Sequence, residues 1–483
     1  MKPVRALLLL LSVFIVFALL SLIFPSGMVL SGTKIPVKIP DLSPASLFNS
    51  SKPHYADISK IISEKKQDSV VKHDTIHKNG KTISLHKVSE VIRAIEYTDS
   101  SKNAMIAFFQ SLKEIKSSEN TIHILHFGDS QLEGDRISDY LRSALQEEFG
   151  GSGPGLLPFS DDFYRLSINM TLSENWKRFE LIHAKELSKL KKCYGPFAGF
   201  FTFTPVSKDS TLVKKKLTTG WLTIKRAGNT LNRSNKYSRC RIYMKNETDR
   251  VKIELTEGKE LLVDDSIPSK QGLRIADYSF QKNPENLTIR FTSAVSPDFY
   301  AINLDSPGGV EVDNIPLRGS AGLNFTDMDK NLLLEMIDRL NVKLILLQFG
   351  VNVAPTEAEN YNYYETKLFH QLTYLKSLRP DMSILVISVS DASKKNGDQY
   401  ESFKNIDKLV EAQRSAAFKS GCAFWDLYDA MGGENSMPAW FAANPTLASP
   451  DFIHFNYAGA RIVGKMFYNA LIHDYNSYLQ EKP

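Results

Sequence analysis

Hydrophobic and polar positions follow several distinct patterns along this chain, and the first is an apolar run near the N-terminus. From Ala6 to Phe24 the sequence reads ALLLLLSVFIVFALLSLIF, a stretch of 19 residues without a charge. Because a helix rises about 1.5 Å per residue, such a run is long enough to cross a hydrocarbon core about 30 Å thick. We therefore expect residues 1–33 to form an N-terminal transmembrane helix that serves as a membrane anchor, or a signal sequence.

The charges beside this run predict its orientation. Lys2 and Arg5 precede it and the next charge is Lys34, so the positive-inside rule keeps the N-terminus in the cytoplasm. A cleaved signal peptide is the alternative, but Phe24 is followed by Pro-Ser-Gly rather than by an A-x-A cleavage pattern. This favours an uncleaved anchor. The expected localisation is therefore a single pass through the cell membrane, with the bulk of the chain outside the cytoplasm, in the periplasm.

The segment after the apolar run has a different composition. Residues 34–85 carry Pro, Ser and Lys without a sustained apolar period, which predicts a spacer. Between residues 88 and 117, apolar residues recur at three- and four-residue steps, which predicts one or two amphipathic helices. We therefore expect residues 34–118 to be a tether followed by a helical segment.

Strands and helices alternate in two separate stretches of the chain. The segment TIHILHFGDS (121–130) predicts a strand that ends in a turn, and DRISDYLRSALQEEF (135–149) has helical periodicity. The alternation resumes after residue 325, and it predicts a mostly parallel sheet covered by helices on both faces. The expected elements there are helices over 326–340, 356–378, 400–419 and 457–477, and strands over 343–350, 383–390 and 423–430.

Between these stretches the pattern predicts only strands. Segments such as RCRIYMKN and ENLTIRFTS are short, rich in β-branched and aromatic residues, and separated by turns. We therefore expect an α/β domain that is interrupted by an all-β module. Its first part is expected over 119–165, the inserted β module over 166–312, and the second part over 313–483.

Composition and charge exclude several classes of protein. With 42% hydrophobic and 23% charged residues, the chain is not mostly disordered, collagen-like or a multi-span membrane protein. A net charge of +5 is too small to indicate a nucleic-acid partner. The three cysteines, Cys193, Cys240 and Cys422, lack the paired spacing of a zinc site. One bridge between Cys193 and Cys240 is conceivable, but three buried thiols are the simpler interpretation.

Ser130 is the first residue that could carry chemistry. It stands in His-Phe-Gly-Asp-Ser-Gln, at the carboxyl end of the first expected α/β strand and just before a helix. Open α/β sheets bind their ligands at this edge, and the amides of the adjoining turn can stabilise an anion. Gly-Asp-Ser is also an ordinary turn sequence, so alone it is weak support for a nucleophile.

Asp451 and His454 form the second candidate group, directly before the last expected helix. Their three-residue spacing allows the carboxylate to accept a proton from one imidazole nitrogen, which leaves the other nitrogen free to act as a general base. The alternative is that Asp451 caps a helical turn and His454 is an ordinary packed polar residue.

Candidate oxyanion donors follow two further strands. Asn352, in Gly350-Val351-Asn352, should emerge at the same sheet edge as Ser130, with an amide available to a developing negative charge. A glycine N–H is the second candidate, provided by Gly319 or alternatively by Gly322. Either Asn352 or these glycines can instead be turn residues.

Together, these residues resemble the blocks of the SGNH (GDSL-type) hydrolase superfamily. The four blocks occur in the family's order, and the match covers residues 119–165 and 313–475. The resemblance implies a flavodoxin-like three-layer α/β/α fold and ester hydrolysis or acyl transfer through an acyl-serine. The blocks are Gly128-Asp129-Ser130, Gly319, Gly350-x-Asn352 and Asp451-x-x-His454.

The resemblance also implies a role for each residue. Ser130 is the nucleophile, His454 the base and Asp451 its orienter, while Asn352 and Gly319 contribute to the oxyanion hole together with the Ser130 amide. Within the superfamily, the chain is similar to exported bacterial peptidoglycan and polysaccharide O-acetylesterases, whose inserted module is similar to a carbohydrate-binding jelly roll. It departs from that group in two ways: Gln131 stands where His is frequent, and Val353 replaces an Asp.

Three functions are consistent with these residues. The leading one is a serine-dependent carbohydrate esterase that removes O-acetyl groups from a cell-envelope glycan such as peptidoglycan or an exopolysaccharide. The same residues serve an O-acetyltransferase of a surface polysaccharide, which would work beside a membrane-bound acyltransferase. The third function is an inactive glycan-binding protein. The expected partners are an acylated glycan and the membrane, and neither a cofactor nor a metal is expected.

Overall fold

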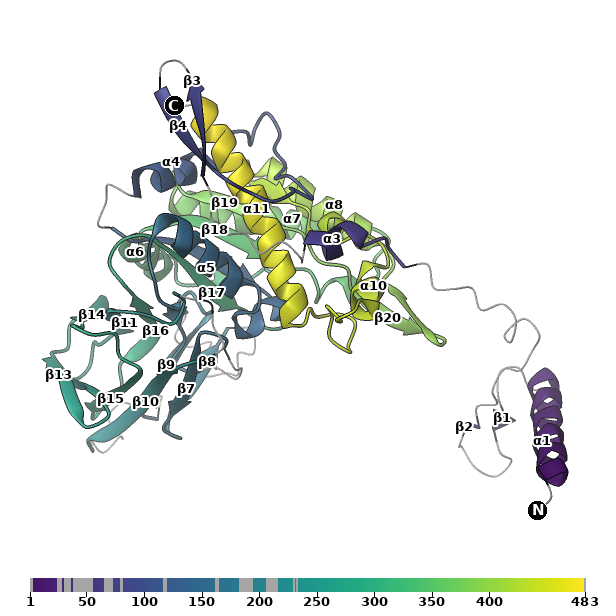
Figure 1. The fold of residues 1–483 in the computed structure, drawn as a ribbon. Helices are drawn as coiled ribbons and strands as arrows, with labels where there is room; N and C mark the ends of the chain where they lie inside the picture. The colour runs from purple at the N-terminus through teal and green to yellow at the C-terminus, as the bar shows by residue number, and fades with distance from the viewer. Residues whose placement is uncertain are drawn as a thin grey trace. The chain divides into compact units, whose positions relative to one another are not determined.

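The structure, a computed structural model, describes most of the chain. The residues described are 3–23, 28–29, 36–37, 55–64, 73–78, 81–115, 120–160, 165–181, 194–205, 216–228, 231 and 233–481. Contacts between residues divide the chain into two units, Met1–His54 and Tyr55–Pro483, and each is described by itself (Figure 1).

The first unit corrects the prediction of a transmembrane helix. It contains the helix α1 (Pro3–Ile23) and a short antiparallel pair, β1 (Met28–Val29) with β2 (Pro36–Val37). A membrane span requires about 20 consecutive apolar residues in one helix. Within the described residues, no helix meets the requirements of length and apolar character together. The predicted anchor over residues 1–33 and the single-pass localisation are therefore not supported.

A five-stranded parallel sheet forms the centre of the second unit. Its strands pair in the order β17-β5-β18-β19-β22, so the first strand in the sequence lies inside the sheet. In the register of these pairs, Gly128 at the end of β5 lies beside Pro316 of β17 and Gln348 of β18. The strands are β5 (Ile122–Gly128), β17 (Val310–Pro316), β18 (Val342–Gln348), β19 (Ser383–Ile387) and β22 (Ala423–Trp425).

Helices cover both faces of this sheet, because successive strand residues point to opposite faces and apolar residues occur on each face. Ile124 of β5 belongs to one buried cluster, whereas Leu125 and Phe127 belong to another. The first cluster joins the sheet to α4 (Ile106–Glu114), α5 (Ser138–Phe149) and α11 (Tyr457–Glu481), and the second joins it to α6 (Lys330–Leu340), α7 (Asn362–Leu378) and α8 (Ile406–Lys419). Burial of both faces is the dominant stabilising contribution in such a layered structure.

Two antiparallel sheets lie between β5 and β17 in the sequence. They pair in the orders β13-β12-β15-β10-β7 and β14-β11-β16-β9-β8, and β6 (Gly155–Leu157) joins β16. Their inner faces share one buried cluster, which includes Leu222 of one sheet and Ile242 of the other. We call this pair of sheets the sandwich. Its strands are β7 (Ile168–Leu172), β8 (Lys177–Glu180), β9 (Gly199–Thr202), β10 (Thr218–Arg226), β11 (Arg239–Lys245), β12 (Val251–Glu257), β13 (Glu260–Ile267), β14 (Leu273–Ser279), β15 (Asn286–Ser293) and β16 (Asp298–Asp305).

Several short elements complete the second unit. In the hairpin of β20 (Ser393–Asn396) and β21 (Gln399–Ser402), β21 overlaps the first residues of the helix expected over 400–419, which begins instead at Ile406. The strand expected over 423–430 ends early, because Asp426 caps α9 (Leu427–Ala430). Further elements are α3 (Ser59–Glu64), the hairpin of β3 (His73–Lys78) and β4 (Lys81–His86), α10 (Ser436–Ala442), and the 3-10 turns η2 (Ser130–Asp135), η4 (Phe325–Asp327) and η5 (Ala354–Thr356).

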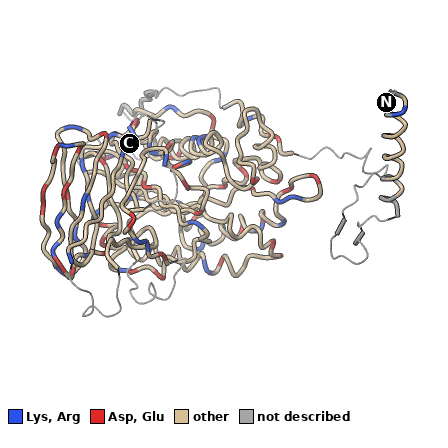
Figure 2. The backbone as a smooth tube through the Cα atoms, turned by 90° about the horizontal axis from the view of Figure 1, so that it is seen from below, with Lys and Arg blue, Asp and Glu red and all other residues tan. Residues whose placement is uncertain are grey.

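The fold-class prediction is therefore corrected as a whole. The molecule is a mixed α/β structure in which antiparallel sheets accompany one parallel sheet, without support for the transmembrane helix. Cys240 and Cys422 are buried free thiols, whereas Cys193 lies outside the described residues. Basic and acidic residues are interspersed along the described chain, as Figure 2 shows, in keeping with the small net charge. The predicted domain boundaries stay a prediction.

Candidate active site

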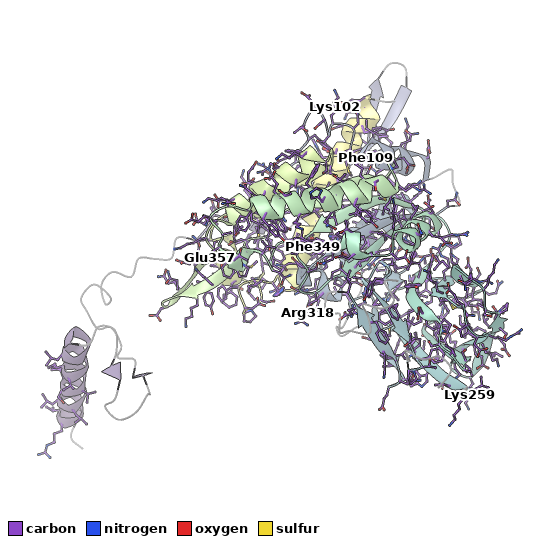
Figure 3. The ribbon with its side chains drawn as sticks, turned by 180° about the vertical axis from the view of Figure 1, so that it is seen from behind. Lys102, Phe109, Lys259, Arg318, Phe349 and Glu357 are labelled. Atoms are coloured by element: carbon purple, nitrogen blue, oxygen red, sulfur yellow. The ribbon has the colours of Figure 1, made fainter. Side chains whose placement is uncertain are left out.

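The candidate site lies where three neighbouring strands end. Because β17, β5 and β18 are parallel and in register, their carboxyl ends meet at one edge of the sheet, and the loops that carry Ser130, Gly319 and Asn352 start there. Figure 3 labels one residue in each of the two flanking loops, Arg318 and Phe349. Gly128 is required at this edge, since a Cβ there would lie 2.7 Å from the carbonyl oxygen of Gln348.

Ser130, His454 and Asp451 form a continuous chain of hydrogen bonds. Ser130 Oγ lies 2.7 Å from His454 Nε2, and His454 Nδ1 lies 2.7 Å from Asp451 Oδ2. With the Nδ1 proton donated to the carboxylate, Nε2 is left as the acceptor for the Ser130 hydroxyl. The Ser130 side chain is largely buried, while 24% of the His454 side chain is exposed. Solvent therefore reaches the pair from the side of His454.

Local bonds keep Asp451 ionised. Partial burial acts to raise its pKa, but the bonds from the His454 ring and from the amides of His454 and Ile453 outweigh burial and lower the pKa below its ordinary value. Both amides donate to Asp451 Oδ1, at 2.9 Å from Ile453 and 3.0 Å from His454. The carboxylate is thus available to orient His454 throughout the neutral range.

Asp129 connects the loop that carries Ser130 to the loop after β18. Its Oδ2 accepts the N–H groups of Gly350 at 3.0 Å and Val351 at 3.2 Å, and its Oδ1 accepts that of Gln131 at 3.1 Å. Complete burial raises the pKa of Asp129 to about 6, although these amide bonds act in the opposite direction. The amide bonds hold the loop that leads to Asn352 beside the loop that carries Ser130.

The oxyanion candidates are placed around the same edge. Asn352 donates one side-chain N–H to the carbonyl of Ser320 at 3.0 Å, which orients its amide. Gly322 donates its N–H to Ser320 Oγ at 3.0 Å, so this group is already engaged. Gly319, with φ of +75°, has its N–H bonded to no acceptor among the described residues. The geometry thus favours Gly319 over Gly322 as an oxyanion donor.

Gln131 and Arg136 also contact this site, and the sequence pattern predicts a role for neither; Gln131 is marked only as a departure from the family's usual His. Both side chains bond to backbone groups beside His454. For Asp129 the sequence likewise predicts only membership of the Gly128-Asp129-Ser130 block. In the described part of the chain, no group of three or more His, Cys, Asp and Glu residues is arranged to hold a metal ion.

Comparisons with known proteins identify the fold. No protein-family model matches the sequence, and no curated protein matches it. A solved acetyl xylan esterase matches with a TM-score of 0.24 at 17% identity, over 34% of this chain and 81% of that one. A solved GDSL-like lipase from Bacteroides ovatus matches with a TM-score of 0.22 at 10% identity, over 62% of this chain and 96% of that one. These scores are too low to support an argument.

A solved peptidoglycan O-acetylesterase matches far better. Its TM-score is 0.61 at 19% identity, and the match covers 79% of this chain and 99% of that one. At this identity the comparison shows the fold. The chain therefore shares the fold of this peptidoglycan O-acetylesterase, as its resemblance to the SGNH hydrolases predicts.

Proposed function

We propose that this protein is a serine-dependent esterase that removes O-acetyl groups from a glycan. The observation that carries this proposal is the hydrogen-bonded chain from Ser130 through His454 to Asp451, at the carboxyl edge of a parallel sheet. This edge is where open α/β sheets place their ligands. A nucleophile, a base with an orienting carboxylate, and oxyanion donors are the groups that ester hydrolysis requires.

The geometry supports a two-step reaction. His454 Nε2 removes the Ser130 hydroxyl proton as Oγ attacks the acetyl carbonyl carbon, and the resulting oxyanion accepts hydrogen bonds from Asn352 and from the Gly319 and Ser130 amides. The tetrahedral intermediate collapses, the bond to the sugar oxygen breaks, and that oxygen takes the proton from His454. Water then attacks the acetyl-serine with His454 again as base. The bond between the acyl carbon and Ser130 Oγ breaks, Oγ takes the proton back from His454, and acetate leaves.

The substrate class is supported by the shared fold. The matching solved structure is that of a peptidoglycan O-acetylesterase, and the match covers 99% of that chain and 79% of this one. We therefore propose an O-acetylated cell-envelope glycan, such as peptidoglycan or an exopolysaccharide, as the substrate. The reaction needs no cofactor, since every group in the two steps belongs to the chain, the ester or water.

Substitution of Ser130 tests the proposal. The full-length protein is expected to release acetate from O-acetylated peptidoglycan and from 4-nitrophenyl acetate. Ser130→Ala removes the nucleophile and is expected to lower kcat by a factor of about 1,000 or more. Acetate release is measured enzymatically, and thermal unfolding verifies that the variant remains folded. A folded Ser130→Ala variant that hydrolyses both esters at the wild-type rate contradicts the proposal.

An acceptor experiment separates hydrolysis from transfer. The protein is incubated with an acetyl donor and an unacetylated oligosaccharide, and the masses of the products are measured by mass spectrometry. Free acetate with an unchanged oligosaccharide supports the esterase. An oligosaccharide that gains acetyl groups identifies a transferase acting through the same Ser130. Glycan binding without either product identifies a binding protein.

A further inference from the structure

The side chain of Gln131 is buried beside Ser130, and each of its polar atoms has a partner. Its Nε2 donates to the carbonyl oxygen of Ile453 at 2.7 Å and to Ser390 Oγ at 3.1 Å. Its Oε1 accepts the N–H of Phe455 at 3.2 Å. Ile453 and Phe455 are the residues on either side of His454, so one amide group bonds to the backbone both before and after the candidate base.

Arg136 makes a second connection between the same two segments. It lies just after η2 and donates to the carbonyl oxygen of Ser130 at 2.5 Å and to that of Phe455 at 2.9 Å. A third bond, to the carbonyl oxygen of Glu133 at 2.8 Å, fixes the guanidinium on its own segment. The loop that carries His454 is thus bonded to the η2 segment at three backbone groups, through Gln131 and Arg136.

Within the chain of hydrogen bonds from Ser130 to Asp451, these bonds act on the one contact that joins two distant segments. Asp451 and His454 are three residues apart, and their mutual orientation is set by bonds within their own loop. Ser130 and His454 are 324 residues apart in sequence, so their 2.7 Å separation depends on how two different segments are held together.

We propose that Gln131 is a positioning residue that sets the distance between the Ser130 hydroxyl and the His454 imidazole. This inference rests on the proposed esterase function and deepens it. Gln131 touches no reacting atom. It acts through the peptide groups of Ile453 and Phe455, which define where the His454 ring lies.

The contacts require an amide in particular. The amide nitrogen of Gln131 faces a carbonyl oxygen and must donate, while its amide oxygen faces an N–H and must accept. Glutamate has the same shape, but when ionised it has no proton for the Ile453 carbonyl and brings a charge into a buried position. Methionine has a similar volume and offers neither a comparable donor nor a strong acceptor.

The test compares Gln131→Met and Gln131→Glu with the wild type. A displacement of about 1 Å in a catalytic group costs about 100-fold in rate. We therefore expect kcat for 4-nitrophenyl acetate to fall by about 10- to 100-fold, with KM changed by less than about threefold, and with Gln131→Glu the worse variant at neutral pH. Crystal structures of the variants are expected to show the Ser130 and His454 side chains beyond hydrogen-bonding distance, with the bond between His454 and Asp451 intact.

Gln371 provides a matched control. It is buried on α7, where its Oε1 accepts the N–H of Thr326 at 3.1 Å and its Nε2 donates to the Thr326 hydroxyl at 3.3 Å. Gln371→Met and Gln371→Glu make the same chemical changes away from the site. They are expected to lower the thermal unfolding temperature and to leave kcat within about twofold of the wild type.

The outcomes separate this inference from the proposed function. Gln131 variants that lose stability to the same extent as the Gln371 variants, but keep kcat and the 2.7 Å contact, overturn the positioning role while the esterase function stands. If the wild type hydrolyses no ester, the proposed function fails. The crystallographic comparison then decides separately whether Gln131 holds His454 against Ser130.

Discussion

Asn352 has two amide protons, and the structure engages one of them. Its bond to the Ser320 carbonyl restrains the plane of the side chain and leaves the second proton available to another acceptor. A donor that is already oriented stabilises a developing oxyanion without reorganisation during the reaction.

We expect Asn352→Ala to lower kcat for ester hydrolysis by about 100-fold, as the loss of one oxyanion donor does in other hydrolases. KM should change little, because the donor acts on the charge that develops in the transition state. Steady-state kinetics with 4-nitrophenyl acetate measure both constants. Asn324→Ala is a suitable control, since that side chain bonds only to the nearby Asp327 among the described residues. An unchanged kcat in Asn352→Ala excludes the side chain from the oxyanion hole.

At the scale of residues, the sequence predicts the groups that belong to fixed motifs and misses those that act through the backbone. Ser130, Asp451 and His454 stand in short motifs that indicate a nucleophile, an orienting carboxylate and a base. The structure brings all three side chains together. Gln131 has no such signal. Its partners are the carbonyl of Ile453 and the N–H of Phe455, groups that every residue except proline possesses, so no sequence pattern marks the contact.

Among the elements, the β20–β21 hairpin supports the loop that carries Asp451 and His454. The ring of Tyr400 stacks on Phe452, with centroids 3.6 Å apart, and the N–H of Ser393 donates to the Phe452 carbonyl at 2.9 Å. Phe452 has φ of +56°, a left-handed conformation that a side chain of this size rarely adopts. The stacked rings thus compensate for backbone strain between the two site residues.

We expect Tyr400→Ser to lower the free energy of unfolding by about 1 to 2 kcal/mol, from the lost ring contact and the exposed Phe452. It should also lower kcat severalfold, since the loop is then free to relax. Tyr400→Phe keeps the ring and should match the wild type in both respects. Urea unfolding and ester hydrolysis measure the two effects. If the Phe and Ser variants behave alike, ring stacking is not what holds the loop.

The hairpin also shows why the sequence is less informative about such elements. Asn396-Gly397 is a recognised hairpin turn, but Lys394 and Lys395 before it give no alternation of apolar and polar residues. The parallel strands were predictable because both of their faces are buried, which makes them continuous apolar runs. The strand expected over 423–430 was extended too far because the apolar pattern continues past Asp426, where a helix cap ends the strand.

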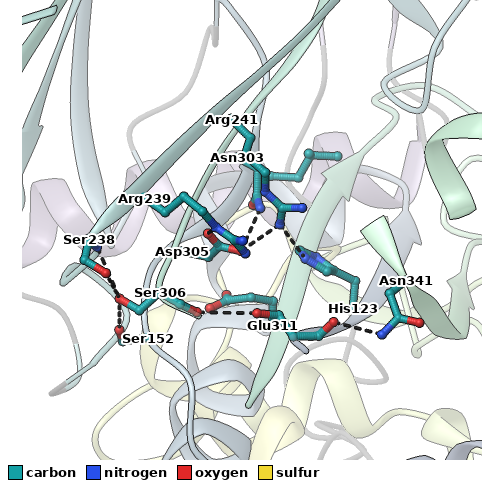
Figure 4. A network of polar contacts seen from close by, with 12 residues as sticks. His123, Ser152, Ser238, Arg239, Arg241, Asn303, Asp305, Ser306, Glu311 and Asn341 are labelled. Atoms are coloured by element: carbon teal, nitrogen blue, oxygen red, sulfur yellow. Dashed lines mark hydrogen bonds and ion pairs between the residues drawn. The ribbon is translucent and has the colours of Figure 1, made fainter. Parts of the chain in front are cut away.

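For the molecule as a whole, a buried polar network joins the sandwich to the parallel sheet (Figure 4). Asp305 of β16 accepts bonds from Arg239 at 2.8 Å and Arg241 at 2.7 Å, and Arg241 reaches His123 of β5 at 3.3 Å. Burial acts to raise the pKa of Asp305, but the two guanidinium groups outweigh it and lower that pKa below its ordinary value. The sandwich and the parallel sheet are therefore connected through a buried carboxylate and the guanidinium groups that stabilise its charge.

We expect Asp305→Ala to lower the free energy of unfolding by about 3 to 5 kcal/mol, because it leaves two arginines without their buried carboxylate. Asp338→Ala removes an exposed partner of Arg379 and should cost less than about 1 kcal/mol. Urea denaturation of both variants measures the difference. Equal losses in the two variants indicate that the network contributes no more than a surface ion pair.

The position of β5 inside the sheet has a consequence for the chain during its synthesis. Translation produces β5 first, then the whole sandwich, and only afterwards the strands β17 and β18 that flank it. Until then the backbone edges of β5 have no strand partners, a situation that slows folding and invites association between nascent chains. Ser130 gains its hydrogen-bonding partner His454 later still, because the loop before α11 follows every strand of the sheet in the sequence, so the chain of hydrogen bonds from Ser130 to Asp451 forms only after all five strands have been made.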